Sequence, residues 1–221
     1  MSSEFRTTAA ILLAVLFAVS MTAGLMAQEK DPNLHGVKFI YQSRPVMATA
    51  TKNEYVSSKF LAEFFDVEIV PAAGGRALKV GGVYYGKDQL SYKGETYVRA
   101  STFLRFFDVG YAQANQWTYD VKESSLPMFD TALYRAQNNA KIKIGSNDGT
   151  ADIVMIKRRK FIALDDAAKV AGLSESAVDT SGSSSGIIKL NGKMVDRWIE
   201  HNDKVYGLTE DLTTVLGKTV Q

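Results

Sequence analysis

Short runs of alternating apolar and polar residues recur along the chain and predict β-strands. The runs cover residues 37–41, 77–80, 82–85, 117–121, 141–144, 153–156 and 187–190. β-branched and aromatic side chains are frequent in them, as is typical of strands half-buried in a sheet. Asn191-Gly192 follows the last run and predicts a type I′ hairpin turn, because that turn needs positive φ at both central residues.

A second pattern, a strand followed by an amphipathic helix, occurs four times. Each copy begins with an aromatic or β-branched pair, continues through apolar residues spaced for one helix face, and stops at Asp or Gly. The copies span residues 55–66, 97–108, 161–172 and 205–217. The aromatic residue and the stop are eleven positions apart in the first three copies, and the fourth copy fits this spacing from Tyr206.

The same pattern predicts helix caps and core positions. A polar residue able to cap the helix follows each pair, and the candidates are Ser57 or Ser58, Ser101, Asp165 and Thr209. Nine residues after the aromatic stand Phe64, Phe106, Val170 and Val215. If each helix packs against a sheet, we expect these four side chains to be buried.

The spacing of the copies predicts two modules in tandem. Copies one and two lie within residues 36–124, and copies three and four lie within residues 140–221. The alternative pairing joins copies two and three across Gly145. Linkers are expected at 71–75, 123–127 and 174–186, and we predict that the last, a serine and glycine tract, is a mobile loop.

The N-terminal segment has the pattern of a secretory signal peptide. An uncharged apolar run covers residues 9–19, and Leu25-Met26-Ala27 places a small residue before Gln28. The strongly apolar part is shorter than the roughly 20 residues that a membrane-spanning helix needs. We therefore predict a signal peptide at residues 1–27 and a secreted or extracytoplasmic protein, in the periplasm or at the cell surface. An uncleaved N-terminal anchor is the alternative, and it would be the only contact with a membrane.

The amino-acid composition excludes several classes of functional site. The 221 residues include 26 Lys and Arg against 24 Asp and Glu, so no overall charge would attract nucleic acid. There is no cysteine, and His35 and His201 are the only histidines. Disulfides, thiolate nucleophiles and a multi-histidine metal site within one chain are thereby excluded. We predict neither a metal nor a cofactor.

Several short motifs between and within the copies are similar to those of a known family. They are Tyr55-Val56, Tyr97-Val98, Leu164, Leu208, Leu190-Asn191-Gly192-Lys193 and Ile142-Lys143-Ile144-Gly145-Ser146. From about Gly36 to Gly217 the chain resembles the copper amine oxidase-like N-terminal domain, or stalk domain, which repeats a strand ending in Tyr-Val-Pro-Leu-Arg, a helix and a Gly. The Pro and the Arg of that motif are absent from all four copies.

The resemblance implies an antiparallel sheet wrapped around a helix, on a secreted or surface protein of bacteria. In the oxidases that give the family its name, this domain is an accessory stalk, and copper belongs to another domain. That catalytic domain needs three histidines and a tyrosine in Asn-Tyr-Asp/Glu, and this chain has two histidines and no Asn-Tyr pair. No copper site is therefore implied here.

Candidate catalytic motifs have structural interpretations. Residues 182–186 match the G-x-S-x-G nucleophile elbow but lie in the serine and glycine tract, without the strand before and the helix after that the elbow requires. Asp165-Asp166 and Glu210-Asp211 are acid pairs in the predicted first turns of helices, where they would interact with the helix dipole.

Candidate binding residues are aromatic or basic. The aromatic residues on predicted strands either pack in the core or stack on sugar rings, and they are Tyr84, Tyr85, Trp117, Tyr119 and Trp198. The one basic cluster either forms a solvated hairpin tip or contacts anionic wall polymer or lipid headgroups, and it consists of Lys157, Arg158, Arg159 and Lys160.

Together these features predict an α+β protein: antiparallel sheets wrapped around short helices, in two tandem repeat-built modules after a signal peptide. Its expected function is that of a secreted, non-catalytic envelope or surface module that binds or scaffolds, with a cell-wall glycan or another envelope protein as partner. The alternative is a secreted hydrolase that acts on cell-wall glycans and uses its own carboxylates for catalysis.

Overall fold

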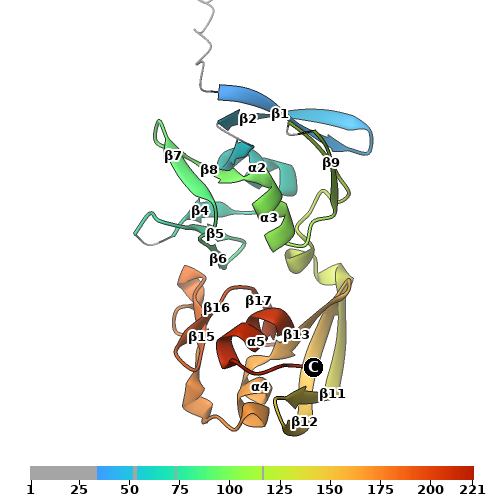
Figure 1. Cartoon of the computed structure of the whole chain (residues 1–221), viewed down its shortest axis with the longest axis vertical. Coiled ribbons are helices and arrows are strands. Elements are labelled where there is room, and N and C mark those ends of the chain that lie inside the picture. The colour runs from blue at the N-terminus through green and yellow to red at the C-terminus, as the bar shows by residue number, and fades with distance from the viewer. Residues whose placement is uncertain (1–33, 52–53, 73, 116) are drawn as a thin grey trace, which may run out of the picture. The chain divides into compact units, whose positions relative to one another are not determined.

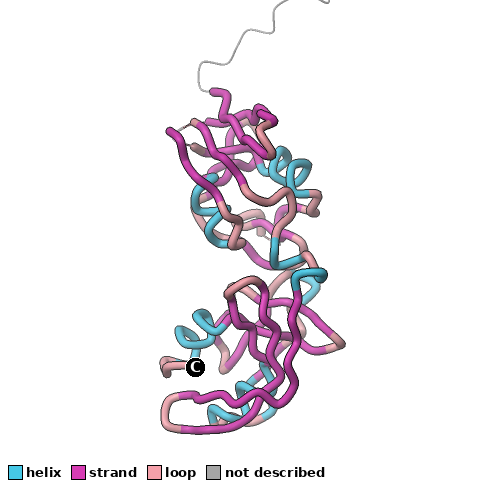
Figure 2. Tube along the Cα trace, turned by 90° about the vertical axis from the view of Figure 1, so that its right-hand side faces the viewer, coloured by secondary structure: helices cyan, strands magenta, loops and turns pink. Residues whose placement is uncertain are grey.

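Strands and four short helices make up the described part of the chain (Figures 1 and 2). The computed structural model describes residues 34–51, 54–72, 74–115 and 117–221, so the predicted signal peptide lies outside the described residues. The α+β class is confirmed. Among the described residues, no helix is both long and apolar enough to cross a membrane.

A seven-stranded sheet forms the centre of the N-terminal lobe, which we define as residues 35–121. The strand order is β7-β8-β3-β2-β1-β10-β9. The strands are β1 (Leu34–Tyr41), β2 (Arg44–Thr51), β3 (Tyr55–Ser57), β7 (Gln89–Tyr92), β8 (Glu95–Arg99), β9 (Tyr111–Asn115) and β10 (Thr118–Val121). β1 and β10 run parallel, so the sheet is mixed and not purely antiparallel as predicted. A small antiparallel sheet accompanies it, formed by β4 (Ile69–Pro71), β5 (Leu78–Val80) and β6 (Val83–Tyr85).

A five-stranded antiparallel sheet forms the centre of the C-terminal lobe, residues 134–221. Its order is β11-β12-β13-β18-β17. The strands are β11 (Tyr134–Ile144), β12 (Asn147–Ile156), β13 (Arg159–Ala163), β18 (Lys204–Leu208) and β17 (Trp198–His201). A second small sheet consists of β14 (Val178–Asp179), β15 (Ile188–Leu190) and β16 (Lys193–Val195). Asn191 and Gly192, between β15 and β16, have φ values of 53° and 73°, which confirms the predicted hairpin turn.

All four predicted strand–helix segments form. The helices are α2 (Ser58–Phe65), α3 (Ala100–Phe106), α4 (Leu164–Ala171) and α5 (Thr209–Leu216), and each begins three residues after the aromatic residue of its copy (Figure 1). The residue six positions after the aromatic has no exposed surface in any copy; these residues are Leu61, Phe103, Ala167 and Leu212. In α2, α3 and α5 this position anchors the helix in the core, because a fully buried Leu or Phe side chain contributes roughly 1.5–3 kcal/mol.

The predicted core position, nine residues after the aromatic, is buried in only two copies. Phe106 and Val215 are 7% and 5% exposed, whereas Phe64 and Val170 are half-buried. The prediction is wrong for Phe64 and Val170. The tenth position shares a helix face with the buried sixth position, and the ninth position is rotated by about 100° from the tenth. In α2 the tenth position, Phe65, is 1% exposed.

Helix ends follow the predicted stops, but the caps do not follow the predicted polar residues. The stops Asp66, Asp108, Gly172 and Gly217 have φ values of 48°, 57°, 76° and 64°, in the left-handed region that terminates helices. Only Ser57 caps its helix, accepting a hydrogen bond of 3.4 Å from the Phe60 N–H. Helices α3 and α4 begin one residue before their polar candidates, and α5 begins at its candidate Thr209. Arg99, Ala163 and Leu208 therefore occupy the N-cap positions, without a side-chain bond.

Candidate functional site

The serine and glycine tract that we predicted to be a mobile loop is ordered and contacts the N-terminal lobe. It contains short 3-10 turns at Glu175–Ala177 and Ser183–Ser185. The Gly186 carbonyl accepts hydrogen bonds from the Tyr84 backbone N–H at 3.1 Å and from the Trp198 indole N–H at 3.3 Å. The Lys79 ammonium donates to the Ser184 carbonyl at 2.6 Å. The tract therefore holds the two lobes together.

Gly186 fits this position because its backbone approaches the β5–β6 turn closely. Its φ is 78°, and a Cβ added there would lie 2.5 Å from the Gly82 oxygen and 2.9 Å from the Tyr84 nitrogen. A side chain would thus overlap with backbone atoms of the opposite lobe. The same turn approaches the linking segment, residues 122–133, because a Cβ on Gly81 would lie 2.8 Å from the Phe129 ring.

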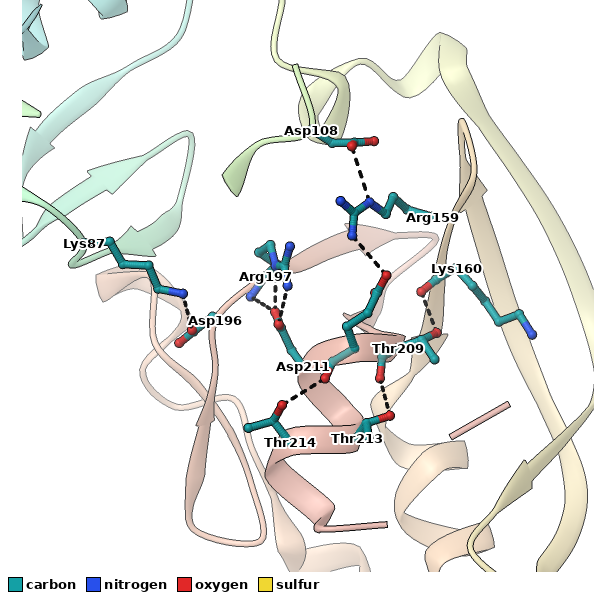
Figure 3. Close-up of polar contacts among 11 residues, drawn as sticks. Lys87, Asp108, Arg159, Lys160, Asp196, Arg197, Thr209, Asp211, Thr213 and Thr214 are labelled. Atoms are coloured by element: carbon teal, nitrogen blue, oxygen red, sulfur yellow. Dashed lines mark hydrogen bonds and ion pairs between the residues drawn. The ribbon is translucent and has the colours of Figure 1, made fainter. Parts of the chain in front are cut away.

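Ion pairs also connect the lobes (Figure 3). Arg159 pairs with Asp108 of the N-terminal lobe at 3.3 Å and with Glu210 of its own lobe at 3.0 Å. Lys157 pairs with Glu123 at 2.6 Å and donates to the Asp108 carbonyl at 3.0 Å. We call these contacts, together with those of Gly186 and Ser184, the inter-lobe joint.

Two residues of the basic cluster take part in the joint. Lys157 and Arg159 are paired with acidic residues of the protein itself. Lys160 is half-buried, and its carbonyl accepts from the Thr209 hydroxyl at 2.7 Å. Of the four residues in the cluster, only Arg158 is exposed and has no partner within the described part of the chain. The cluster lies at a hairpin turn, between β12 and β13, and Lys157 and Arg159 contribute to the joint.

Cations also stack on an aromatic ring at this contact. The Lys87 ammonium lies 5.1 Å and the Arg197 guanidinium 5.6 Å from the centre of the Phe106 ring, within the range of a cation–π interaction. Lys87 pairs with Asp196 at 3.2 Å, and Arg197 pairs with Asp211 at 2.6 Å (Figure 3).

A groove of about 410 Å³ opens beside the joint and has walls from both lobes. Three aromatic residues line it: Phe129, Tyr134 and Trp198. Polar groups of Thr131, Ser183, Ser184 and Glu200 complete it. The combination of aromatic residues and a few polar groups is typical of small-molecule sites.

Tyr134 is held in place at this groove. Its hydroxyl donates to the Met128 carbonyl at 2.5 Å, and its ring lies 5.6 Å from that of His201 in an edge-on arrangement. Burial, and then the charge of Asp130, raises the pKa of Tyr134 to about 12, so the phenol stays protonated and keeps donating.

The five candidate aromatics do not form one surface. Tyr85 and Tyr119 have no exposed surface, so they belong to the core and cannot stack on a sugar. Tyr84 and Trp117 are half-buried, the latter 5.4 Å from the His35 ring. Trp198 is 5% exposed and is the only one of the five that lines the groove.

The buried tyrosines have structural roles. The Tyr85 ring packs against Phe103, Phe106 and Phe107. The Tyr119 hydroxyl donates to Glu54 at 2.8 Å. Burial, with a contribution from nearby carboxylates, raises the pKa of both tyrosines above the ordinary range.

A second, more polar pocket of about 810 Å³ lies on the C-terminal lobe between the β11–β12 hairpin and α4. Asp152 binds Lys204 there at 2.6 Å, and this bond, together with the Asn139 N–H, lowers the pKa of Asp152. Asp166 also lines the pocket and accepts from the Asp152 N–H at 2.9 Å.

The sequence motifs for catalysis have structural roles. Asp166 and Asp211 each bind a backbone N–H of a neighbouring strand region, while Asp165 and Glu210 are exposed in the first helical turns. Ser184 lies in a 3-10 turn between β14 and β15, which is not the strand–turn–helix setting of a nucleophile elbow. Within the described ranges, no group of three His, Asp or Glu residues is placed to hold a metal ion.

Phe129 and Tyr134 were missed at the sequence level because they follow the predicted linker 123–127. Two aromatics shortly after Pro127 were a usable signal, since a solvated linker rarely carries large apolar side chains. The contribution of residues 183 and 184 had no such signal.

Comparisons with protein-family models, with curated proteins and with solved structures found no match for this chain.

Proposed function

We propose that this chain is a secreted, non-catalytic module of the bacterial envelope or surface that binds a cell-wall glycan in the groove between its lobes. The observation that carries the proposal is the composition of that groove: Phe129, Tyr134 and Trp198 beside Ser184 and Glu200. Aromatic rings pack on the apolar faces of sugars, and hydroxyl and carboxylate groups bond their hydroxyls. The proposed extracytoplasmic location rests on the sequence of residues 1–27.

The joint supports a scaffolding role as well. A hydrogen bond at Gly186 and the contacts of Lys157 and Arg159 connect the lobes. A site whose walls come from two lobes keeps its shape only if the lobes are fixed, because ordering them on binding would cost affinity.

We also propose that the lobes are two tandem, stalk-like modules, residues 36–124 and 140–221, each built from two copies of the repeat. Strands of copies one and two pair as β3 with β8, and strands of copies three and four pair as β13 with β18. In the second lobe, equivalent acids make equivalent bonds: Asp166 accepts from the Asp152 N–H, and Asp211 from the Arg197 N–H.

A carboxylate-dependent hydrolase of cell-wall glycans is the second candidate, because Asp152 and Asp166 line the same polar pocket. The lowered pKa of Asp152 keeps this carboxyl charged, whereas a general acid needs a raised pKa. Both carboxylates are also already bonded to groups of the protein. Binding therefore accounts for the site better than hydrolysis does.

The proposal is tested with residues 28–221 and purified cell-wall material in a pelleting assay. Ser184→Tyr fills the groove without removing a contact, since only the backbone carbonyl of Ser184 is bonded. Ser185→Tyr is the matched control, because this neighbour is also exposed but does not line the groove. We expect Ser184→Tyr to lower wall retention at least tenfold and Ser185→Tyr to leave it unchanged.

Equal retention of both variants, or no retention of the unaltered chain, would overturn the proposal. Reducing ends are measured in the same samples. Their saturable release by the unaltered chain would favour the hydrolase instead.

A further inference from the structure

We propose that the groove continues along the C-terminal lobe as one track, and that its occupant is an extended glycan chain that carries no acidic groups. This inference rests on the proposed function and adds the length and the charge of the ligand.

We infer the continuity of the track from residues that line two neighbouring depressions. Glu200 lines both the groove and a depression of about 440 Å³ over residues 200–205. Lys204 lines that depression and also the polar pocket. Asp166 and Lys169 line the polar pocket and a depression of about 680 Å³ that reaches Glu175.

The strands under the track give it length. β17 runs from Trp198 in the groove to His201, roughly 10 Å at the usual rise per residue. His201 pairs with Lys204 on β18, and Lys204 reaches Asp152 on β12 through their ion pair. A ligand that fills the track must therefore extend well beyond a single sugar ring.

Unused hydrogen-bonding groups face the ligand in the polar pocket. The side chains of Asn138, Asn139 and Thr150 line it and have no hydrogen-bond partner within the described residues. An amide offers both donors and an acceptor, and a hydroxyl offers one donor and two acceptor sites, so they match the hydroxyl and acetamido groups of a sugar.

The charge of the track selects against acidic polymers. Two ammonium groups, Lys169 and Lys204, line it. Seven carboxylates also line it: Asp148, Asp152, Asp165, Asp166, Glu175, Glu200 and Asp203. This excess of negative charge repels a polyanion and leaves neutral or amino-bearing glycans as the acceptable class.

The test compares soluble N-acetylglucosamine oligomers of two and six units by isothermal titration calorimetry on residues 28–221. We expect the hexamer to bind at least tenfold more tightly than the dimer. Thr150→Trp, which fills the polar pocket from an exposed strand position, should reduce the hexamer affinity to that of the dimer and leave dimer binding unchanged. Ser91→Trp, at an exposed strand position of the other lobe, is the control and should change neither. Thermal unfolding of both variants checks that they fold.

Equal affinities of dimer and hexamer, or a Thr150→Trp variant that keeps the full length dependence, would overturn the track while wall retention through the groove persists. Binding of polygalacturonate as tight as that of the hexamer would overturn the charge argument. Absence of wall retention by the unaltered chain would instead overturn the proposed function itself, so the two failures are distinguishable.

Discussion

Replacing Gly186 with alanine tests the inter-lobe joint at its closest approach. Two costs follow from the structure: the residue has a φ of 78°, and the new Cβ would lie 2.5 Å from the Gly82 oxygen. Alanine in the left-handed region costs roughly 1–2 kcal/mol. Overlap with packed atoms typically costs about 1–3 kcal/mol. If the contact opens to relieve the overlap, the bond from the Tyr84 N–H is lost at about 1 kcal/mol.

Gly192→Ala separates the two costs. Gly192 has a φ of 73°, and nothing lies within 4 Å of its added Cβ, so only the backbone cost applies. We expect Gly192→Ala to lower the free energy of unfolding by about 1 kcal/mol. Gly186→Ala should lower it by about 3–4 kcal/mol, because the overlap or the lost hydrogen bond is added.

Urea unfolding followed by circular dichroism measures both changes, and limited proteolysis within residues 174–186 reports whether the tract has detached. Gly186→Ala should be cleaved faster there than Gly192→Ala. Equal stability losses with equal cleavage would refute the conclusion that this tract is docked on the N-terminal lobe.

Three further predictions concern the core and the ion pairs. Phe103→Ala should destabilise by about 3–5 kcal/mol in thermal unfolding, because the ring has no exposed surface; a loss below 1 kcal/mol would contradict the helix–sheet packing. Asp211→Ala should lower the free energy of unfolding in urea by about 2 kcal/mol or more, because it leaves the largely buried Arg197 guanidinium without its ion pair. The control Asp165→Ala, at an exposed position, should lower it by less than about 1 kcal/mol. Equal losses would contradict a stabilising role of the Arg197–Asp211 pair. The lowered pKa of Asp152 means that its bond to Lys204 stabilises the fold above the ordinary aspartate pKa and is lost as pH falls through the lowered value. Lys204→Met should flatten that acidic limb of the stability profile, and an unchanged limb would show that the ion pair does not contribute.

Periodicity predicted the local structure because it is set within a few residues. The eleven-residue spacing places Gly172 and Gly217 in the left-handed region, and it places Asp66 and Asp108 there as well. The hydrophobic pattern selects the correct helices but not the exact face, since Phe64 and Phe65 are equally apolar and only packing decides that Phe65 is buried.

The joint and the groove could not be predicted in the same way. Arg159 meets Asp108 across 51 positions of sequence, and Tyr84 meets Gly186 across an even longer separation. A serine and glycine composition indicates a loop but does not show whether another lobe packs on it. Likewise, the alternation that places Tyr84 and Tyr85 on a strand does not show which of them faces the core.

Fluorescence of Trp198 tests the central claim, binding in the groove, most directly. Trp117 and Trp198 are the only tryptophans, so Trp117→Phe leaves an indole that lines the groove as the sole tryptophan. Titration of this variant of residues 28–221 with soluble cell-wall glycan fragments should give a saturable change in emission, which Ser184→Tyr abolishes and Ser185→Tyr preserves. A constant emission over a range of concentrations at which the same protein is retained on cell walls would place the ligand elsewhere and contradict the account.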